Sequence, residues 1–204
     1  MQPFRADRRR LIAGTMATGL LSSVCAAAAA GPKSVSPIPK TRIIKSRSGH
    51  YIRDASLDLT GYLLPAKDIK IGTFAFDYFG FGGPDDFESF EKKGQTIPTW
   101  TPFMAVFEDL SSAEKQGEHG PYRANSLRVF CSHYIISREV IEFTGHDRQV
   151  GYVRFRGRAN TVFLAGQLDP DGALDGAYDA AMTGDLFVGG TAFRNIHFSY
   201  WAGD

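Results

Sequence analysis

The sequence has few of the residues that build cross-links or reactive centres. It holds two cysteines and five histidines among 204 residues. The HExxH and paired CxxC spacings of zinc sites do not occur, nor does the GxSxG pattern of α/β hydrolases. These absences weigh against a zinc enzyme, a serine hydrolase and a disulfide-stapled fold, so stability must come from packing. They also indicate no cofactor and no metal ion.

An excess of charge is also lacking. The formal net charge is +1, and it becomes about −2 without residues 1–30, which hold four arginines and one aspartate. A protein so close to neutral has no global attraction to nucleic acid or to an anionic membrane. We therefore predict no nucleic-acid partner, and we expect any anion site to be local.

The first 30 residues have the composition of a cleavable export signal. Three consecutive arginines at residues 8–10 precede a weakly apolar stretch, residues 11–30, that contains Ala-x-Ala cleavage sites. The run at residues 8–12 resembles the bacterial twin-arginine signal. The resemblance implies a periplasmic or secreted bacterial protein, cleavage near Gly31, and the twin-arginine export machinery as a partner of residues 1–30. The general secretory route remains the alternative.

Polar and small residues dilute the apolar stretch of this signal. Gly14, Thr15, Thr18, Gly19 and Ser22 interrupt it, whereas a membrane span needs about 20 strongly apolar residues. We therefore expect no permanent membrane span, with an uncleaved anchor as the weaker alternative.

Beyond the signal, the chain divides into a linker and one domain. Residues 31–40 hold three prolines and no apolar rhythm, which is typical of a tether. Residues 41–204 have a length that suits a single domain with its own core. Short alternating stretches rich in Phe, Tyr, Val, Ile and Thr, separated by turn residues, indicate strands. The predicted strands are residues 42–45, 57–63, 69–78, 102–108, 126–136, 140–144, 149–158, 161–168, 181–188 and 192–200.

Helical signals are few. One short helix is predicted at residues 84–93, because Pro84 suits a first helical turn and Asp85 and Asp86 suit its positive end. A second short helix at residues 173–182 is the weaker alternative, because Gly172 and Gly176 oppose it. No long helical pattern recurs between the strands, so the sheet is expected to be antiparallel. The predicted fold class is all-β, an antiparallel β-barrel or a strongly curved β-sandwich with one short helix.

In strand number, glycine-punctuated strands and export signal, the chain resembles the lipocalin and YceI-type polyisoprenoid-binding barrels. This is a likeness of architecture, and it transfers no binding residues. It implies a ligand enclosed within the barrel.

Aromatic residues gather around the glycines of residues 74–83. We predict that Phe74, Phe76 and Tyr78, with Trp100 beyond them, line the mouth of an apolar ligand pocket. Ordinary core packing is the alternative.

One face of the strand at residues 149–158 carries Tyr152, Arg154 and Arg156, which alternate with Val153 and Phe155 on the other face. If the arginine face points inward, these side chains would bind the polar head group of a ligand. The alternative is a solvated face that pairs with neighbouring acids.

A reactive cluster is also conceivable from the sequence. Simple alternation places Cys131 and His133 on the same face of one strand, and His197 lies in the last strand. A thiolate near an imidazole can act as a nucleophile with its base, or as a pair of metal ligands. A buried thiol and ordinary core or surface histidines are the alternative.

Three functional hypotheses follow. The first is a non-enzymatic exported bacterial binding protein that encloses a small apolar or amphipathic molecule. The second is a barrel enzyme, an isomerase or cyclase or a metal-dependent enzyme, that uses Cys131, His133 and His197 by analogy with allene oxide cyclase-like and dirigent-like barrels. The third is a surface interaction module without a cavity, which a filled barrel interior would favour.

Overall fold

The computed structural model describes residues 40–46, 50–117, 120–160 and 180–203. The expected export signal, the predicted strand at residues 161–168 and most of the doubtful second helix lie outside the described residues. Among the residues described, no helix has both the length and the apolar character needed to cross a bilayer.

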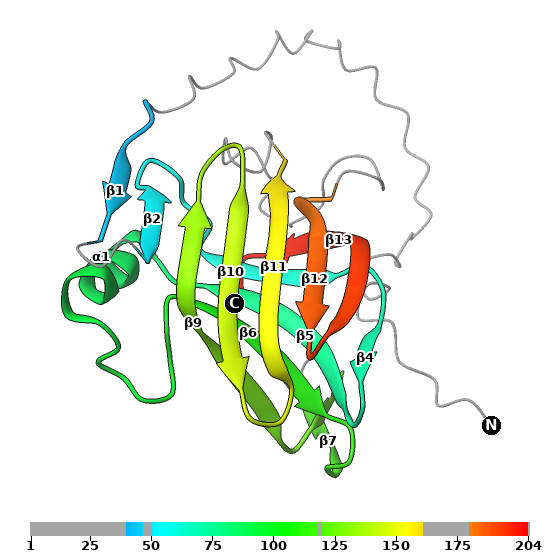
Figure 1. The fold of residues 1–204 in the computed structure, drawn as a ribbon. Coiled ribbons are helices and arrows are strands. Elements are labelled where there is room, and N and C mark those ends of the chain that lie inside the picture. Colours follow the sequence, from blue (N-terminus) through cyan, green and yellow to red (C-terminus); the bar gives the residue numbers. More distant parts are fainter. Residues whose placement is uncertain (1–39, 47–49, 118–119, 161–179, 204) are drawn as a thin grey trace, which may run out of the picture.

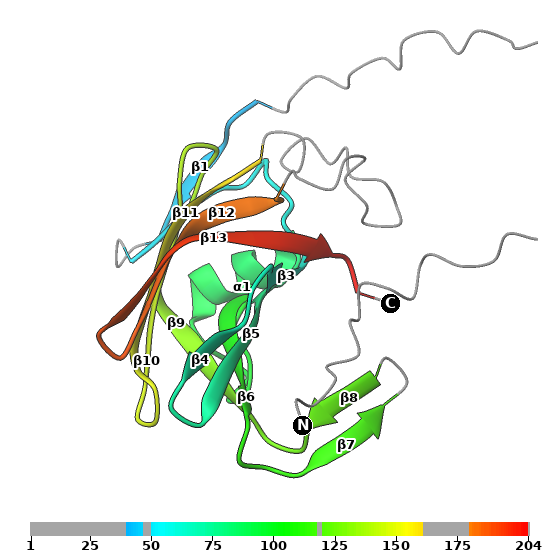
Figure 2. The same cartoon turned by 90° about the vertical axis from the view of Figure 1, so that its right-hand side faces the viewer.

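Eight antiparallel strands close into a barrel (Figures 1 and 2). The ring begins at β9, runs through neighbouring strands to β6, and closes where β6 pairs with the first half of β9. The strands of the ring, in spatial order, are β9 (Ser126–Ile136), β10 (Ile141–Asp147), β11 (Gly151–Ala159), β12 (Met182–Val188), β13 (Thr191–Trp201), β3 (Gly61–Pro65), β5 (Phe74–Phe81) and β6 (Phe103–Asp109). The predicted antiparallel barrel is confirmed.

The remaining strands pair with strands of this ring, extend it, or form a separate hairpin. The short strand β4 (Ile69–Ile71) forms a hairpin with β5. The second half of β9 pairs in parallel with β2 (Tyr51–Asp54), which in turn pairs with β1 (Ile43–Lys45). A separate hairpin of β7 (Glu114–Gly117) and β8 (Gly120–Arg123) projects from the barrel (Figure 2).

Most predicted elements are close to the observed ones, and the differences have local causes. The helix α1 (Pro84–Lys93) and strand β9 match their predictions. The stretch predicted as one strand at residues 69–78 is instead the β4–β5 hairpin, which turns at Gly72 with φ of +57°. The strand predicted to start at residue 57 begins at Gly61, because the Asp58 carboxylate accepts hydrogen bonds from the backbone N–H and the hydroxyl of Thr60 and forms a turn.

Phenylalanine rings fill the middle of the barrel. Phe79 on β5 is fully buried, and its ring centroid lies between 4.9 and 5.7 Å from those of five other rings. These neighbours are Phe76, Phe103, Phe143, Phe155 and Phe198. Rings from both sides of the barrel therefore meet at its centre.

Glycines on two adjacent strands make room for one of these rings. Gly157 on β11 pairs with Gly184 on β12. A Cβ atom on Gly157 would lie 2.4 Å from the Phe155 ring, and one on Gly184 would lie 2.6 Å from it. A side chain at either position would force the ring to move.

The helix α1 closes the barrel where β9 changes its partner from β6 to β2. Phe87 and Phe90 on α1 are buried, and the Phe87 ring meets that of Tyr134 edge-on, with centroids 5.5 Å apart. Behind them, the Nε atom of Arg53 donates to Glu91 Oε1 over 2.9 Å. The Tyr134 hydroxyl donates to the same oxygen over 2.7 Å. A buried ion pair with a third hydrogen-bonding partner thus fixes the helix to β2 and β9.

Candidate functional site

The aromatic residues predicted to line a pocket mouth are not brought together. A β-bulge at Asp77 interrupts the alternation of β5. Phe76 is therefore buried in the core, while Tyr78 is half-buried and meets the ring of Tyr62 edge-on at 5.1 Å. Phe74 packs against the edge of the core.

Trp100 lies in the segment between α1 and β6, beyond the end of β5. Its ring is close to Gly82, where a Cβ atom would approach it to 2.8 Å. The four aromatic residues therefore form no common mouth.

The cluster of Cys131, His133 and His197 does not form either. A register shift between β9 and β10 pairs Cys131 with Gly145 and His133 with Thr144, which leaves Ser132 as an extra residue. Cys131 is buried and His133 lies on the outer side, so the prediction that they share a face is wrong.

The third member of that cluster is remote from both. His197 is exposed on β13, which is four strands away from β9 in either direction around the ring. Among the described residues, no group of three or more His, Cys, Asp or Glu side chains is arranged to hold a metal ion.

The surroundings of Cys131 make it a poor nucleophile. Burial raises the pKa of the Cys131 thiol to about 12, although a hydrogen bond with Thr101 acts in the opposite direction. At pH 8 such a thiol carries about one thiolate in ten thousand, and the thiolate is the reactive form.

We therefore predict that Cys131 resists thiol reagents in the folded protein. In a Cys25→Ser background, where it is the sole cysteine, dithiobis(nitrobenzoate) at pH 8 should leave the native protein unmodified over the time in which the urea-unfolded protein reacts completely. Rapid modification of the native protein would contradict this description of the thiol.

The outer surface of β10 to β13, here called the arginine wall, carries a row of arginines. Along β11 the side chains of Val153 and Phe155 point inward, Gly157 is buried on the same face, and the side chains between them point to solvent. The outward arginines of this wall are Arg154, Arg156 and Arg158 of β11 and Arg194 of β13, and Tyr152 continues the row along β11. The wall faces the viewer in Figure 1. The predicted ligand residues Tyr152, Arg154 and Arg156 therefore face solvent and not the barrel interior.

Two arginines of this wall are paired with acids. Arg156 forms an ion pair with Glu142 on β10. Arg194 Nη1 lies 2.6 Å from Asp185 Oδ2. The backbone N–H of Asn195 donates to the other oxygen of Asp185, and these two contacts lower the pKa of Asp185 below its usual range.

The other two arginines give the wall a surplus of positive charge. Within the described ranges, no acid forms an ion pair with Arg154 or Arg158. Arg156 remains largely accessible despite its partner, with 72% of its side chain exposed. The wall therefore offers guanidinium groups to an anion in solution.

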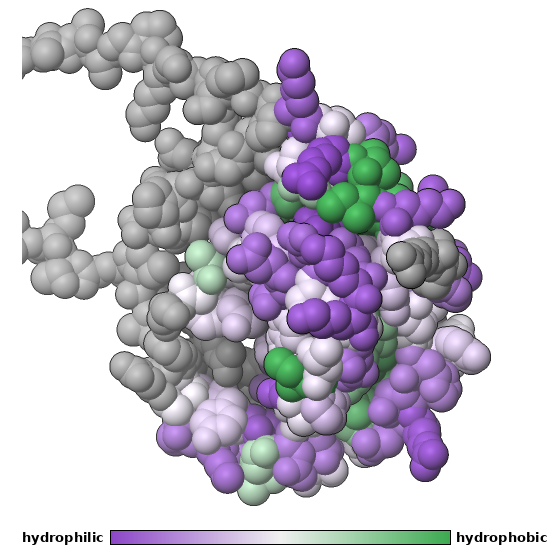
Figure 3. All heavy atoms as spheres, turned by 90° about the vertical axis from the view of Figure 1, so that its left-hand side faces the viewer, coloured by the Kyte–Doolittle hydropathy of each residue, from purple (hydrophilic) through white to green (hydrophobic). Residues whose placement is uncertain are grey.

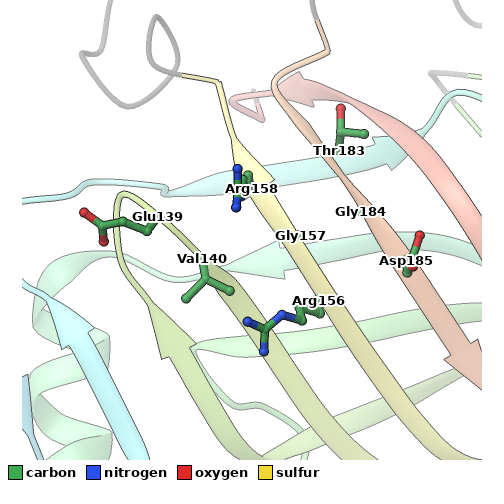
Figure 4. Close-up of a pocket in the computed structure, with 8 residues that line it drawn as sticks. All are labelled: Glu139, Val140, Arg156, Gly157, Arg158, Thr183, Gly184 and Asp185. Atoms are coloured by element: carbon green, nitrogen blue, oxygen red, sulfur yellow. The ribbon is translucent and has the colours of Figure 1, made fainter.

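A hollow of about 340 Å³ lies in the arginine wall (Figure 4). One rim is the turn between β9 and β10, where the Ser137 hydroxyl donates to Glu139 Oε2 over 2.8 Å. The lining residues are Glu139, Val140, Arg156, Gly157, Arg158, Thr183, Gly184 and Asp185. Cationic donors, a hydroxyl group and carboxylate acceptors thus line an open depression on the outer surface of the sheet.

Comparison of the chain with known proteins identifies no relative. No family model, no curated protein and no solved structure matches the chain. The site must therefore be judged from its own chemistry.

Among the described residues, no broad apolar patch is visible on the side of the molecule that carries β1, β2 and α1 (Figure 3). In Figure 3 the described residues on that side are mainly hydrophilic, and the hydrophobic groups are small and separated. This distribution agrees with a barrel whose apolar side chains are turned inward.

The sequence predicted part of this hollow. Alternation along β11 places Arg158 beside Arg156, although Arg158 was not among the predicted ligand residues. Thr183 and Asp185 were not singled out, because their position opposite β11 depends on the register across residues 161–179. No local sequence signal fixes that register.

Proposed function

We propose that this protein is an exported, non-enzymatic binding module that recognises an anionic ligand on the outer wall of its barrel. The observation that carries the proposal is the surplus of arginine on the arginine wall, beside a hollow lined by Arg156 and Arg158. The export signal expected in residues 1–30 supports an extracytoplasmic location. The filled interior favours binding on the surface, because an enclosed apolar ligand would have to displace buried phenylalanines.

The chemistry of the hollow favours a ligand with a carboxylate or phosphate group. A guanidinium group donates to such anions in a bidentate, charge-assisted manner. Glu142 holds the Arg156 guanidinium in place, and Arg158 has no acid partner in the described part of the chain, so an anion meets less competition there. Hydrogen bonds to charged groups contribute about 1.5 to 3 kcal/mol each. Two of them amount to about 3 to 6 kcal/mol before the cost of association is subtracted, so a single small anion is expected to bind weakly.

The enzyme alternative loses its geometric basis, because Cys131, His133 and His197 lie on different faces or walls of the barrel. Cys131 is buried, while both histidines lie on the outer side. A substrate in the hollow would contact none of the three.

Titration with galacturonate, followed by amide NMR, tests the proposal. We expect the largest shifts at Arg156, Arg158 and Thr183, and at least a tenfold loss of affinity in Arg158→Ala, which corresponds to about 1.4 kcal/mol. Arg148→Ala is the matched control, because it removes the same charge from an exposed turn at the other end of β11. Equal weakening by both variants, or shifts confined to other surfaces, would contradict a specific site.

A further inference from the structure

We propose that the arginine wall binds an acidic polysaccharide in an extended form, and that the hollow is one subsite of a longer track. This inference rests on the proposed function and names its ligand class. It follows from features of the wall that lie beyond the hollow.

The first feature is a ladder of cations along β11. Arg154, Arg156 and Arg158 occupy alternate positions of one regular strand, so successive guanidinium groups leave the backbone about 6.6 Å apart. From Tyr152 to Arg158 the row is about 20 Å long. The hollow is lined by Arg156 and Arg158 but not by Arg154. A small ligand in the hollow therefore leaves half of the row unused, whereas a linear polymer can contact all of it.

The second feature is an exposed aromatic ring that continues this row. The Tyr152 ring lies at the end of the ladder away from the hollow, and the residue is 68% exposed. It pairs across the strands with His146, with ring centroids 4.7 Å apart. An aromatic ring held in this way offers a flat apolar surface to the C–H face of a sugar.

The third feature is the acids placed among the arginines. Glu142 lies beside Arg156, Asp185 pairs with Arg194, and Glu139 stands at the rim of the hollow. The backbone of single-stranded DNA would bring phosphates close to these carboxylates and offers them no hydroxyl donor. In an acidic polysaccharide, hydroxyl groups lie between the anionic groups, and they can donate to the carboxylates. The mixed charge of the wall therefore favours the polysaccharide.

The experiment compares galacturonate with its linear hexamer, using the same protein and isothermal titration calorimetry at several salt concentrations. We expect the hexamer to bind at least tenfold more tightly than the monomer, because linked subsites add avidity. The logarithm of the association constant for the hexamer should fall linearly with the logarithm of salt concentration as counterions are released.

Variants of Arg154 distinguish binding along the whole track from binding in the hollow alone. Arg154→Ala should weaken hexamer binding about three- to tenfold and leave monomer binding unchanged, because Arg154 does not line the hollow. Arg154→Lys retains the positive charge and should restore most of the hexamer affinity. Arg148→Ala, outside the row, should leave both affinities unchanged. Because Arg154 is exposed, these variants should give amide spectra of a folded protein.

Each outcome has a distinct meaning. A monomer that binds in the hollow together with a hexamer that binds no more tightly would overturn the track and leave the proposed function standing. If neither ligand binds, both proposals fail. A single-stranded deoxyoligonucleotide that binds more tightly than the hexamer, with the same dependence on Arg154, would overturn the polysaccharide assignment.

Discussion

Replacing Phe79 by Ala is expected to lower the free energy of unfolding by about 3 to 5 kcal/mol. The Phe79 ring is fully buried and contacts five other aromatic rings at the centre of the barrel. Its removal takes away the transfer free energy of the ring and leaves a cavity that the opposing walls cannot close. Rings held by several strands relax little, so the loss should lie toward the upper part of this range.

Urea unfolding, followed by circular dichroism, measures this loss. Phe187→Ala is the control, because Phe187 lies on the outer wall of β12 and is only half-buried. Its main described partner is the Arg194 guanidinium, 4.6 Å above its ring, so its removal should cost about 1 kcal/mol or less. The Phe79→Ala cavity should also bind benzene, as apolar cavities of this kind do. A loss below about 1 kcal/mol for Phe79→Ala would mean that the interior is loosely packed or hydrated, and the account of a filled barrel would be wrong.

Replacing Glu91 by Ala is expected to destabilise the protein by about 3 to 5 kcal/mol, because it leaves the charge of Arg53 buried without a partner. The side chains of Arg53 and Glu91 are 3% and 5% exposed. The change also removes the acceptor of the Tyr134 hydroxyl, whose pKa is raised by burial and by the Glu91 carboxylate. The helix α1 should therefore loosen from the end of the barrel.

Two comparisons separate this effect from a general loss of helix stability. Glu88→Ala removes an exposed partner of Lys92 from the same helix and should change the stability far less than Glu91→Ala. The double variant Arg53→Met with Glu91→Leu removes both charges and should recover much of the lost stability. If Glu88→Ala and Glu91→Ala are equally harmful, or if the double variant is worse than Glu91→Ala, the buried pair is not what fastens α1.

The fold was predictable where signals are local. Pro84, Asp85 and Asp86 mark the start of α1, and the Gly94 that follows marks its end. Regular alternation gave β11 its two faces, and those faces are observed. Phenylalanine-rich strands without intervening helical patterns indicated an antiparallel barrel. These features depend on residues that lie close together in the sequence.

The predictions of strand faces fail where the two-residue alternation of inward and outward side chains is interrupted. Bulges at Asp77 and Ser132 shift the faces of β5 and β9, so Tyr78 and His133 lie outside while Phe79 and Tyr134 lie inside. No residue type marks these bulges. The Ser132 bulge stands where β9 leaves β6 for β2, a tertiary event that local patterns do not report.

For a related reason, only part of the candidate site could be predicted from the sequence. Alternation predicts that Tyr152, Arg154 and Arg156 share a face, but it does not say whether that face is inside or outside the barrel. Side-chain volume decides which face of β11 points into the barrel. The phenylalanines of the other strands fill the interior and leave no space there for the arginines. The partners Thr183 and Asp185 follow only from the pairing of β11 with β12.

Ligand should bind to the outer arginine wall while the barrel interior stays filled. The most direct measurement is a side-chain NMR titration with galacturonate that observes both places in one sample. Binding on the outer wall should shift the Thr183 methyl signal and leave the Phe79 ring signals and the Val153 methyl signals inside the barrel unchanged. Shifts of the interior signals without a shift of Thr183 would contradict binding on the outer wall.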